Sequence, residues 1–185
     1  MDRLKKAAIL TTLTRKLLDH DSWCGETHLQ KAVYLLLELF KVPMDFKFIL
    51  YRHGPFSFDL RDEITSLRAD GLLRLEPQPY PYGPKLVPDE QRCVKLKKLF
   101  PLTLKKYDTY LDFIAQELGG KNVTELEHIA TALYVTTEKS EPKASVEKRS
   151  EELRRLKPHF SVNGAKQAVD DIDKISKEAN SIRTQ

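Results

Sequence analysis

The chain has 185 residues, of which 41% are hydrophobic and 31% charged, and its formal net charge is +4. This size fits one domain with at most a small extension. A chain of this size can bury enough apolar surface to fold without disulfide bonds or a structural metal. The two cysteines, Cys24 and Cys93, form no CxxC pair and no disulfide framework. No stretch approaches the roughly 18 apolar residues that cross a bilayer, and no cleavage site follows the basic N-terminus. We therefore expect a cytoplasmic globular protein rather than a secreted, membrane-spanning, collagen-like or disordered one.

The first predicted elements are two helices. Apolar residues at spacings of three and four predict a helix over residues 2–18. Thr27 and Gln30 have the spacing of a capping box, in which the Thr27 hydroxyl accepts from the Gln30 amide and the Gln30 side chain reaches back. The helix that begins there ends before Pro43, which cannot continue it. Gln30 and Tyr34 lie off its apolar face, and we interpret them as amphipathic filler or surface contacts.

A strand, a turn and a third helix follow. Aromatic and β-branched residues predict a short strand over residues 46–51. A tight turn is predicted next, at His53, Gly54 and Pro55. Ser57 is placed to cap a helix over residues 58–69, and Gly71 stands where a left-handed residue after that helix is wanted.

The remaining elements are a hairpin and a series of helices. Residues 72–75 and 85–87 predict two strands around a proline-rich tip. Beyond them the chain is predicted to be helical, and residues 137–157, rich in charge, predict an exposed helix or a linker. The predicted helix starts are marked by Pro101, Asn122 and Ser161.

The order helix, helix, strand, helix, hairpin is close to a winged-helix arrangement. We predict a mostly α fold with a small β component, in which residues 1–136 form a winged-helix-like helical domain with a β-hairpin wing. Residues 137–185 then form a charged segment and a C-terminal helical extension packed on the same domain. In winged-helix folds the helix before the wing enters a major groove, but many such domains bind only protein, so both kinds of partner stay open.

The candidate recognition helix is net acidic. Between residues 58 and 70 it carries four acidic residues against Arg61 and Arg68, so a duplex would repel it. The two arginines are seven residues apart and can share a face, although pairing with neighbouring acids is their more ordinary use. The basic segment over residues 85–106 and the wing, where tyrosines can stack on bases or simply shape the turn, are better contacts for DNA. The candidate contacts for a partner or DNA are Lys85, Arg92, Lys95, Lys97, Lys98, Arg61, Arg68, Arg74, Tyr80 and Tyr82.

No catalytic constellation is found. The chain has no GxSxG, P-loop or GxGxxG motif. Glu125 and His128 have the spacing of a metal pair but lack the third ligand of a catalytic zinc, and His53 with Asp59 is the only other suggestive pair. Cys24 has no sequence neighbour that would activate it, so we interpret it as a small buried hydrophobe. We expect a non-enzymatic protein without cofactor or metal, a hydrolase or nuclease that uses these histidines being the weakest alternative.

Three segments have a distinctive sequence: residues 25–36 read GETHLQKAVYLL, residues 51–60 read YRHGPFSFDL, and residues 67–72 read LRADGL. Together they resemble the YwgA-like and Panacea-type (SocA-like antitoxin) bacterial families. Those families pair an LQKxxYL helix with a YGPxS-type turn and a later short helix that ends in Gly-Leu. Here His53 takes the place of the first aromatic of that turn, and residues 157–161 are similar to a late family segment. The resemblance implies a winged-helix-like fold without established catalytic activity, and a role as an antitoxin or adaptor in toxin–antitoxin and phage-defence systems.

Two functions follow. The first is a non-enzymatic binding or adaptor module that acts through a protein partner, as an antitoxin or a phage-defence component. The alternative is a DNA-binding transcriptional regulator that uses the wing and residues 85–106. Neither function involves a membrane, and the sequence names neither the partner nor the oligomeric state.

Overall fold

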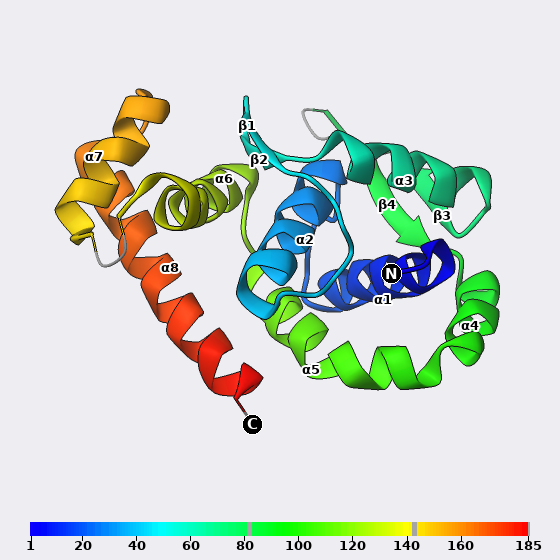
Figure 1. Cartoon of the computed structure of the whole chain (residues 1–185). Coiled ribbons are helices and arrows are strands. Elements are labelled where there is room, and N and C mark those ends of the chain that lie inside the picture. Colours follow the sequence, from blue (N-terminus) through cyan, green and yellow to red (C-terminus); the bar gives the residue numbers. More distant parts are fainter. Residues whose placement is uncertain (81–82, 142–143, 185) are drawn as a thin grey trace.

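The structure, a computed structural model, describes residues 1–80, 83–141 and 144–184. The described chain is mostly helical, with two small antiparallel hairpins (Figure 1). The predicted mostly α fold with a small β component is therefore confirmed, while the winged-helix description stays a prediction. No helix of the described residues is long and apolar enough to cross a membrane.

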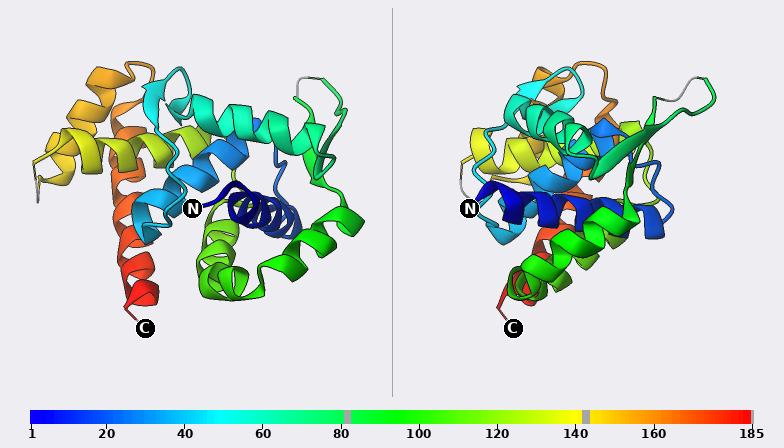
Figure 2. Two further views of the ribbon diagram at one scale, coloured as in Figure 1. Left: turned by 45° about the vertical axis from the view of Figure 1, so that its right-hand side comes forward. Right: turned by 90° about the vertical axis from the view of Figure 1, so that its right-hand side faces the viewer.

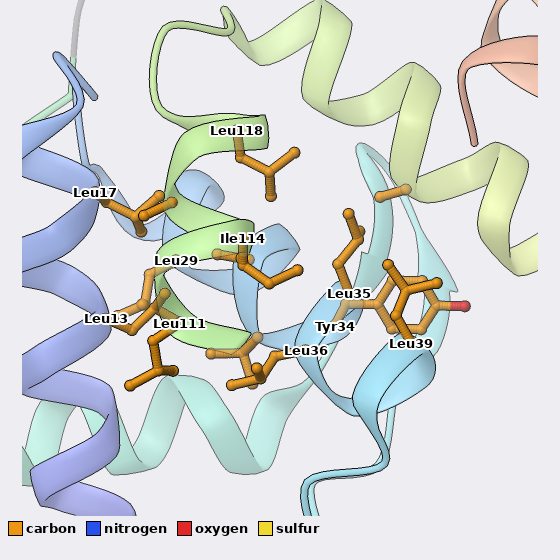
Figure 3. Close-up of a cluster of buried hydrophobic side chains, with 14 of the residues drawn as sticks. Leu13, Leu17, Leu29, Tyr34, Leu35, Leu36, Leu39, Leu111, Ile114 and Leu118 are labelled. Carbon is orange, nitrogen blue, oxygen red and sulfur yellow. The ribbon is translucent and has the colours of Figure 1, made fainter. Parts of the chain in front are cut away.

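The core forms where α1 (Arg3–Asp19), α2 (Glu26–Phe40) and α5 (Pro101–Leu118) meet. Helix α2 is buried around most of its circumference, as expected for a helix that is apolar on several faces. Leucine and isoleucine side chains from the three helices interdigitate in the centre (Figure 3). The fully buried ones include Leu13, Leu17, Leu29, Leu36, Leu111, Ile114 and Leu118.

The predicted capping box of the second helix is wrong. Helix α2 begins one residue before Thr27, with Gly25 as its N-cap and no side-chain cap. The Gln30 side chain turns away from its own helix and bonds Ser57 instead. Gln30 and Tyr34 are also buried, not surface contacts, because α2 has neighbours on almost every side.

The first hairpin replaces a predicted strand and turn. Strand β1 (Ile49–Tyr51) is shorter than predicted, and the predicted turn contains a second strand, β2 (Gly54–Phe56). The two strands are antiparallel, with Ile49 opposite Phe56 and Tyr51 opposite Gly54. Gly54 has a φ of 81°, a left-handed conformation that a residue with a side chain rarely adopts.

The next elements follow the sequence closely. Helix α3 (Phe58–Ala69) is capped by Ser57, whose hydroxyl accepts from the Leu60 amide, and Gly71 has a φ of 68° after its end. Both predictions are thereby confirmed. Strands β3 (Leu73–Glu76) and β4 (Lys85–Pro88) form the predicted hairpin, which is the second hairpin of the chain. It projects from the helices in the right-hand view of Figure 2.

Beyond the second hairpin the chain is helical, as predicted. Helix α4 (Glu90–Leu99) leads into α5, which begins at Pro101, and α6 (Val123–Tyr134) begins with a complete capping box between Asn122 and Glu125. The next turn of α6 is a π-helix, η1 (Val135–Lys139).

The C-terminal helices pack on the domain. Helix α7 (Val146–Leu156) lies against α8 (Val162–Arg183), and α8 also contacts α2, α5 and α6 (Figure 1). Ser161 caps α8, as predicted. The charged stretch over residues 137–157 is helical over much of its length and has a buried side, on which Leu153 is fully buried. Arg149, on the same side, forms a two-pronged bond to Asp173 at 2.6 and 2.7 Å.

Candidate functional site

Four apolar side chains, three of them exposed and Phe56 half-buried, form a surface patch on the first hairpin and the start of α3. We call this set, Ile49, Tyr51, Phe56 and Phe58, the aromatic patch. Tyr51 is 48% exposed and Phe58 is 41% exposed. The three rings contact one another, with centroids 5.2 Å apart for Phe56 and Phe58 and 5.8 Å apart for the other two pairs. Apolar side chains gathered in this way mark binding surfaces more often than scattered ones do.

The register of the hairpin explains why these side chains gather. Alternate residues of a strand point to the same face, so Ile49 and Tyr51 share one face of β1. Phe56 lies opposite Ile49 and joins that face, and Phe58 follows two residues later. The guanidinium of Arg61, one turn into α3, lies 5.0 Å from the centroid of the Phe58 ring. The patch therefore combines aromatic rings with an arginine.

The back of the hairpin is held by buried polar side chains of α2. Gln30 Nε2 donates to the Ser57 carbonyl at 2.9 Å, and the Ser57 amide donates to Gln30 Oε1 at 3.0 Å. The next residue, Lys31, donates from Nζ to the Pro55 carbonyl at 2.8 Å. Because both α2 residues are almost completely buried, water competes little for these bonds.

A second buried lysine approaches the hairpin from the far end of the sequence. Lys157 donates from Nζ to the Tyr51 carbonyl at 2.8 Å and also to the Arg52 carbonyl. The backbone of the hairpin is therefore bonded from two directions, by α2 on one side and by the residue after α7 on the other. This arrangement fixes the backbone that carries the aromatic patch.

Glu127 supplies the negative charge beside these lysines. Its Oε1 lies 3.0 Å from Lys157 Nζ, close enough for an ion pair, although no aligned hydrogen-bond donor reaches that oxygen from the described residues. Burial lowers the pKa of Lys31 to about 8, because the loss of hydration outweighs attraction to Glu127 and because Lys157 repels it. We call Gln30, Lys31, Glu127 and Lys157 the buried clamp.

Two exposed histidines border the buried clamp. His53 Nδ1 and His159 Nε2 lie 3.5 and 3.6 Å from the carboxylate oxygens of Glu127. The partner of His53 is thus Glu127, whereas the sequence suggested Asp59. Within the described ranges no three His, Cys, Asp or Glu side chains are placed to hold a metal ion. At this position Lys157 already neutralises the carboxylate.

The suggested metal pair on α6 has structural roles. Glu125 completes the capping box by accepting from the Asn122 amide at 2.7 Å. His128 packs against Phe160 with ring centroids 4.0 Å apart. The first contact caps α6, and the second packs α6 against the segment before α8.

Two of the predicted basic contacts bond other residues of the fold. Arg92 donates to the Asp70 carbonyl at 2.9 Å and its guanidinium lies against Gly71, so it joins α4 to the end of α3. Arg74 pairs with Glu76 at 2.6 Å on the wing. Glu76 compensates the charge of Arg74, whereas Arg92 keeps its charge but has one N–H group already engaged by a backbone carbonyl.

Other predicted contacts lie at the surface. Lys95 and Lys98 are exposed and Lys97 is half-buried, and none of the three side chains forms an ion pair or hydrogen bond in the part of the chain that the structure describes. Lys85 begins β4, and Tyr80, at the hairpin tip, is 97% exposed. Tyr82 lies outside the described residues.

The two arginines of α3 face a cavity of about 570 Å³. Its walls come from α3, the β3–β4 hairpin, the start of α2 and the loop before α6. Arg61 and Arg68 do share a helix face, as their spacing suggested, and both line this cavity. Arg61 is also paired with Asp62 at 3.2 Å, whereas Arg68 has no hydrogen bond or ion pair to any described residue.

Comparison with models of protein families, with curated proteins and with solved structures found no match. The family resemblance of the sequence motifs therefore stays a prediction. The structure nevertheless brings those motifs together, because the segments around Gln30, Tyr51 and Lys157 meet at one hairpin.

Three members of the aromatic patch, Tyr51, Phe56 and Phe58, lie in the motif over residues 51–60, but none of them was among the predicted contacts. The available signal was the alternation of Ile49, Tyr51, Phe56 and Phe58 around a Gly-Pro turn, which a hairpin places on one face. Glu127 carried no comparable signal, since a single acidic residue in an amphipathic helix is ordinarily exposed.

Proposed function

We propose that the chain is a non-enzymatic binding module that acts through a protein partner, as an antitoxin or a phage-defence component. The observation that carries this proposal is the aromatic patch, in which three mutually contacting rings lie beside an arginine at the surface of the first hairpin and the start of α3. Aromatic residues and arginine are enriched at the energetic centres of protein interfaces.

The buried clamp supports this function. A binding surface that is already ordered loses less conformational entropy when a partner binds. Gln30, Lys31 and Lys157 bond the backbone of the hairpin at Ser57, Pro55 and the turn, so the rings are displayed on a rigid support. A cluster that is buried and bonded to backbone in this way fits a positioning role better than a catalytic one.

The resemblance of the motifs supports the antitoxin or defence role. The segments that carry the resemblance contain three residues of the patch, Tyr51, Phe56 and Phe58, and three residues of the clamp, Gln30, Lys31 and Lys157. The two thiols, Cys24 and Cys93, are buried and free, which agrees with the cytoplasmic setting that the sequence predicts.

The proposal is tested by capture of partners from cells that encode the chain. The tagged protein is compared with the double variant Tyr51→Ser/Phe58→Ser and with Leu102→Ser, an exposed apolar residue of α5 outside the patch. We expect the double variant to lose the partner by roughly 30-fold or more, since truncation of a central interface residue costs about 2 kcal/mol or more. Equal recovery of every protein with all three forms would contradict the proposal.

A DNA-binding regulator is the second candidate, and Lys95, Lys97 and Lys98 of α4, which have no ion-pair partner among the described residues, favour it. Mobility shifts on random duplex DNA at several salt concentrations test it, with the triple variant Lys95→Glu/Lys97→Glu/Lys98→Glu alongside. Binding through these lysines would weaken steeply with salt and vanish in the variant. Unchanged affinity of the variant would exclude this segment as the DNA contact.

A further inference from the structure

The cavity beside α3 has the size and composition of a small-molecule site. Its volume, about 570 Å³, lies within the roughly 300–1,000 Å³ typical of ligand pockets. Helix α3 contributes Arg61, Ile64, Thr65 and Arg68, the spacing of a single helix face. The cavity thus has a wall on which an apolar side chain lies between two guanidinium groups.

The other walls add apolar surface. Leu75 and Leu86 come from the second hairpin, and Trp23 comes from the segment before α2. The indole Nε1 of Trp23 donates to the Gly83 carbonyl at 3.3 Å, which holds the ring against the hairpin. A flat apolar ligand would therefore contact an aromatic side chain and aliphatic side chains in the same cavity.

The charges of the cavity are unevenly distributed. Asp21 and Glu26 lie on the wall near the start of α2, whereas the two arginines lie on α3 and Lys121 lies in the loop before α6. Arg61 already pairs with Asp62 and packs on Phe58. Arg68 has no such partner among the described residues, so its guanidinium is available to a bound acidic group.

We infer that this cavity binds a small organic anion, with a flat apolar body against Trp23 and Ile64 and a carboxylate, sulfonate or phosphate group held by Arg68. A guanidinium forms paired, charge-assisted hydrogen bonds with such groups. This inference goes beyond the proposed protein partner and does not depend on it. None of the four side chains of the aromatic patch lines the cavity, and the arginine assigned to the ligand is Arg68, not Arg61, which packs on Phe58.

Trp23 is the only tryptophan of the chain and gives the test a local signal. The probes are 8-anilinonaphthalene-1-sulfonate, which carries an acidic group on a flat apolar body, and the neutral N-phenyl-1-naphthylamine. We expect the sulfonate to quench Trp23 emission in a saturable way and to bind roughly ten-fold more tightly than the neutral probe, as one charge-assisted hydrogen bond allows. A rise in probe fluorescence without quenching of Trp23 would overturn the inference.

Three variants locate the binding. Arg68→Gln should weaken the sulfonate roughly ten-fold and leave the neutral probe unchanged. Thr65→Phe, which fills the cavity from α3, should weaken both probes, and Lys98→Gln on α4 is the matched charge control that should affect neither. Thermal melting confirms that each variant is folded. Equal affinity of the sulfonate for Arg68→Gln and the unmodified chain, or undiminished binding to Thr65→Phe, would overturn the inference.

Discussion

Gln30 and Ser57, which are 27 positions apart in the sequence, exchange two hydrogen bonds through one side-chain amide. The amide of Gln30 pairs with both the N–H and the C=O of Ser57, in the way that a neighbouring strand would. Ser57 is itself the N-cap of α3. One side chain of the central helix therefore fixes both the end of the first hairpin and the start of α3.

Replacement of Gln30 by leucine tests this relationship. Gln30→Leu keeps the volume but leaves the buried N–H of Ser57 without a partner, while the Ser57 carbonyl still accepts from the Arg61 amide at 3.1 Å. We expect urea denaturation to show a loss of about 1–3 kcal/mol, the cost of one unpaired buried group. The control is Gln167→Leu on the exposed side of α8, which should change stability by less than about 0.5 kcal/mol. Equal effects of the two replacements would contradict the role assigned to Gln30.

Glu127 is predicted to be essential for the buried clamp. Glu127→Gln leaves the ammonium groups of Lys31 and Lys157 buried without a counter-charge, and such a loss typically costs about 3–5 kcal/mol. The control is Glu117→Gln, because burial and the nearby Glu178 raise the pKa of Glu117, so neutralisation there relieves a cost. Near neutral pH, thermal melting should show strong destabilisation for the first variant and none for the second. A neutral effect of Glu127→Gln would show that the lysines do not need the carboxylate.

His28 makes stability depend on pH. Burial lowers its pKa below the ordinary 6.5, more than its bond to the Leu118 carbonyl raises it. Below pH 6.5 the unfolded chain therefore takes up a proton that the folded chain resists, so the free energy of unfolding falls as the pH decreases. Above that pH the group contributes no slope.

The variant His28→Gln isolates this effect. Its amide can still donate to the Leu118 carbonyl but cannot titrate, so the fall in stability between pH 6.5 and 5 should be smaller than in the unmodified chain. Some slope remains, since burial also lowers the pKa of His128. Denaturation curves collected between pH 6.5 and 5 measure this dependence. If the free energy of unfolding falls as steeply in the variant as in the unmodified chain, His28 is not the source of the pH dependence.

Gly54 is predicted to tolerate no side chain. Its φ of 81° is strained for other residues, and a Cβ would lie 2.8 Å from the Thr131 hydroxyl oxygen. Gly54→Ala should therefore destabilise the chain by about 1–3 kcal/mol. Gly120→Ala is the matched control, because a Cβ there meets nothing within 4 Å. If both variants melt at the same temperature, the close approach of β2 to α6 is not needed for folding.

Local signals in the sequence identified many of the elements. Ser57, Asn122 and Ser161 lie at helix starts because their side chains satisfy amides a few residues away, an effect that a short window reveals. Gly71 has the expected left-handed conformation for a similarly local reason. The second hairpin was predicted because its strands flank a proline-rich tip.

The errors have a different origin, because they concern partners that are distant in sequence. Thr27 and Gln30 have the right spacing for a capping box, but Gln30 instead bonds Ser57 on the other side of the hairpin. Lys31 and Glu127 are charged residues that short patterns place in solvent, and only the tertiary fold brings them together with Lys157. The buried clamp therefore could not be predicted from local sequence patterns alone.

The central claim is that the aromatic patch contacts a protein partner, and site-specific photo-crosslinking tests it most directly. The aromatic photo-crosslinker p-benzoylphenylalanine is introduced at Phe58 or at Tyr51 in cells that encode the chain, and at Tyr80 and Leu102 as exposed controls. We expect one discrete crosslinked protein from both patch positions and none from the controls. Crosslinks that arise only at the controls, or no crosslink from either patch position, would contradict it.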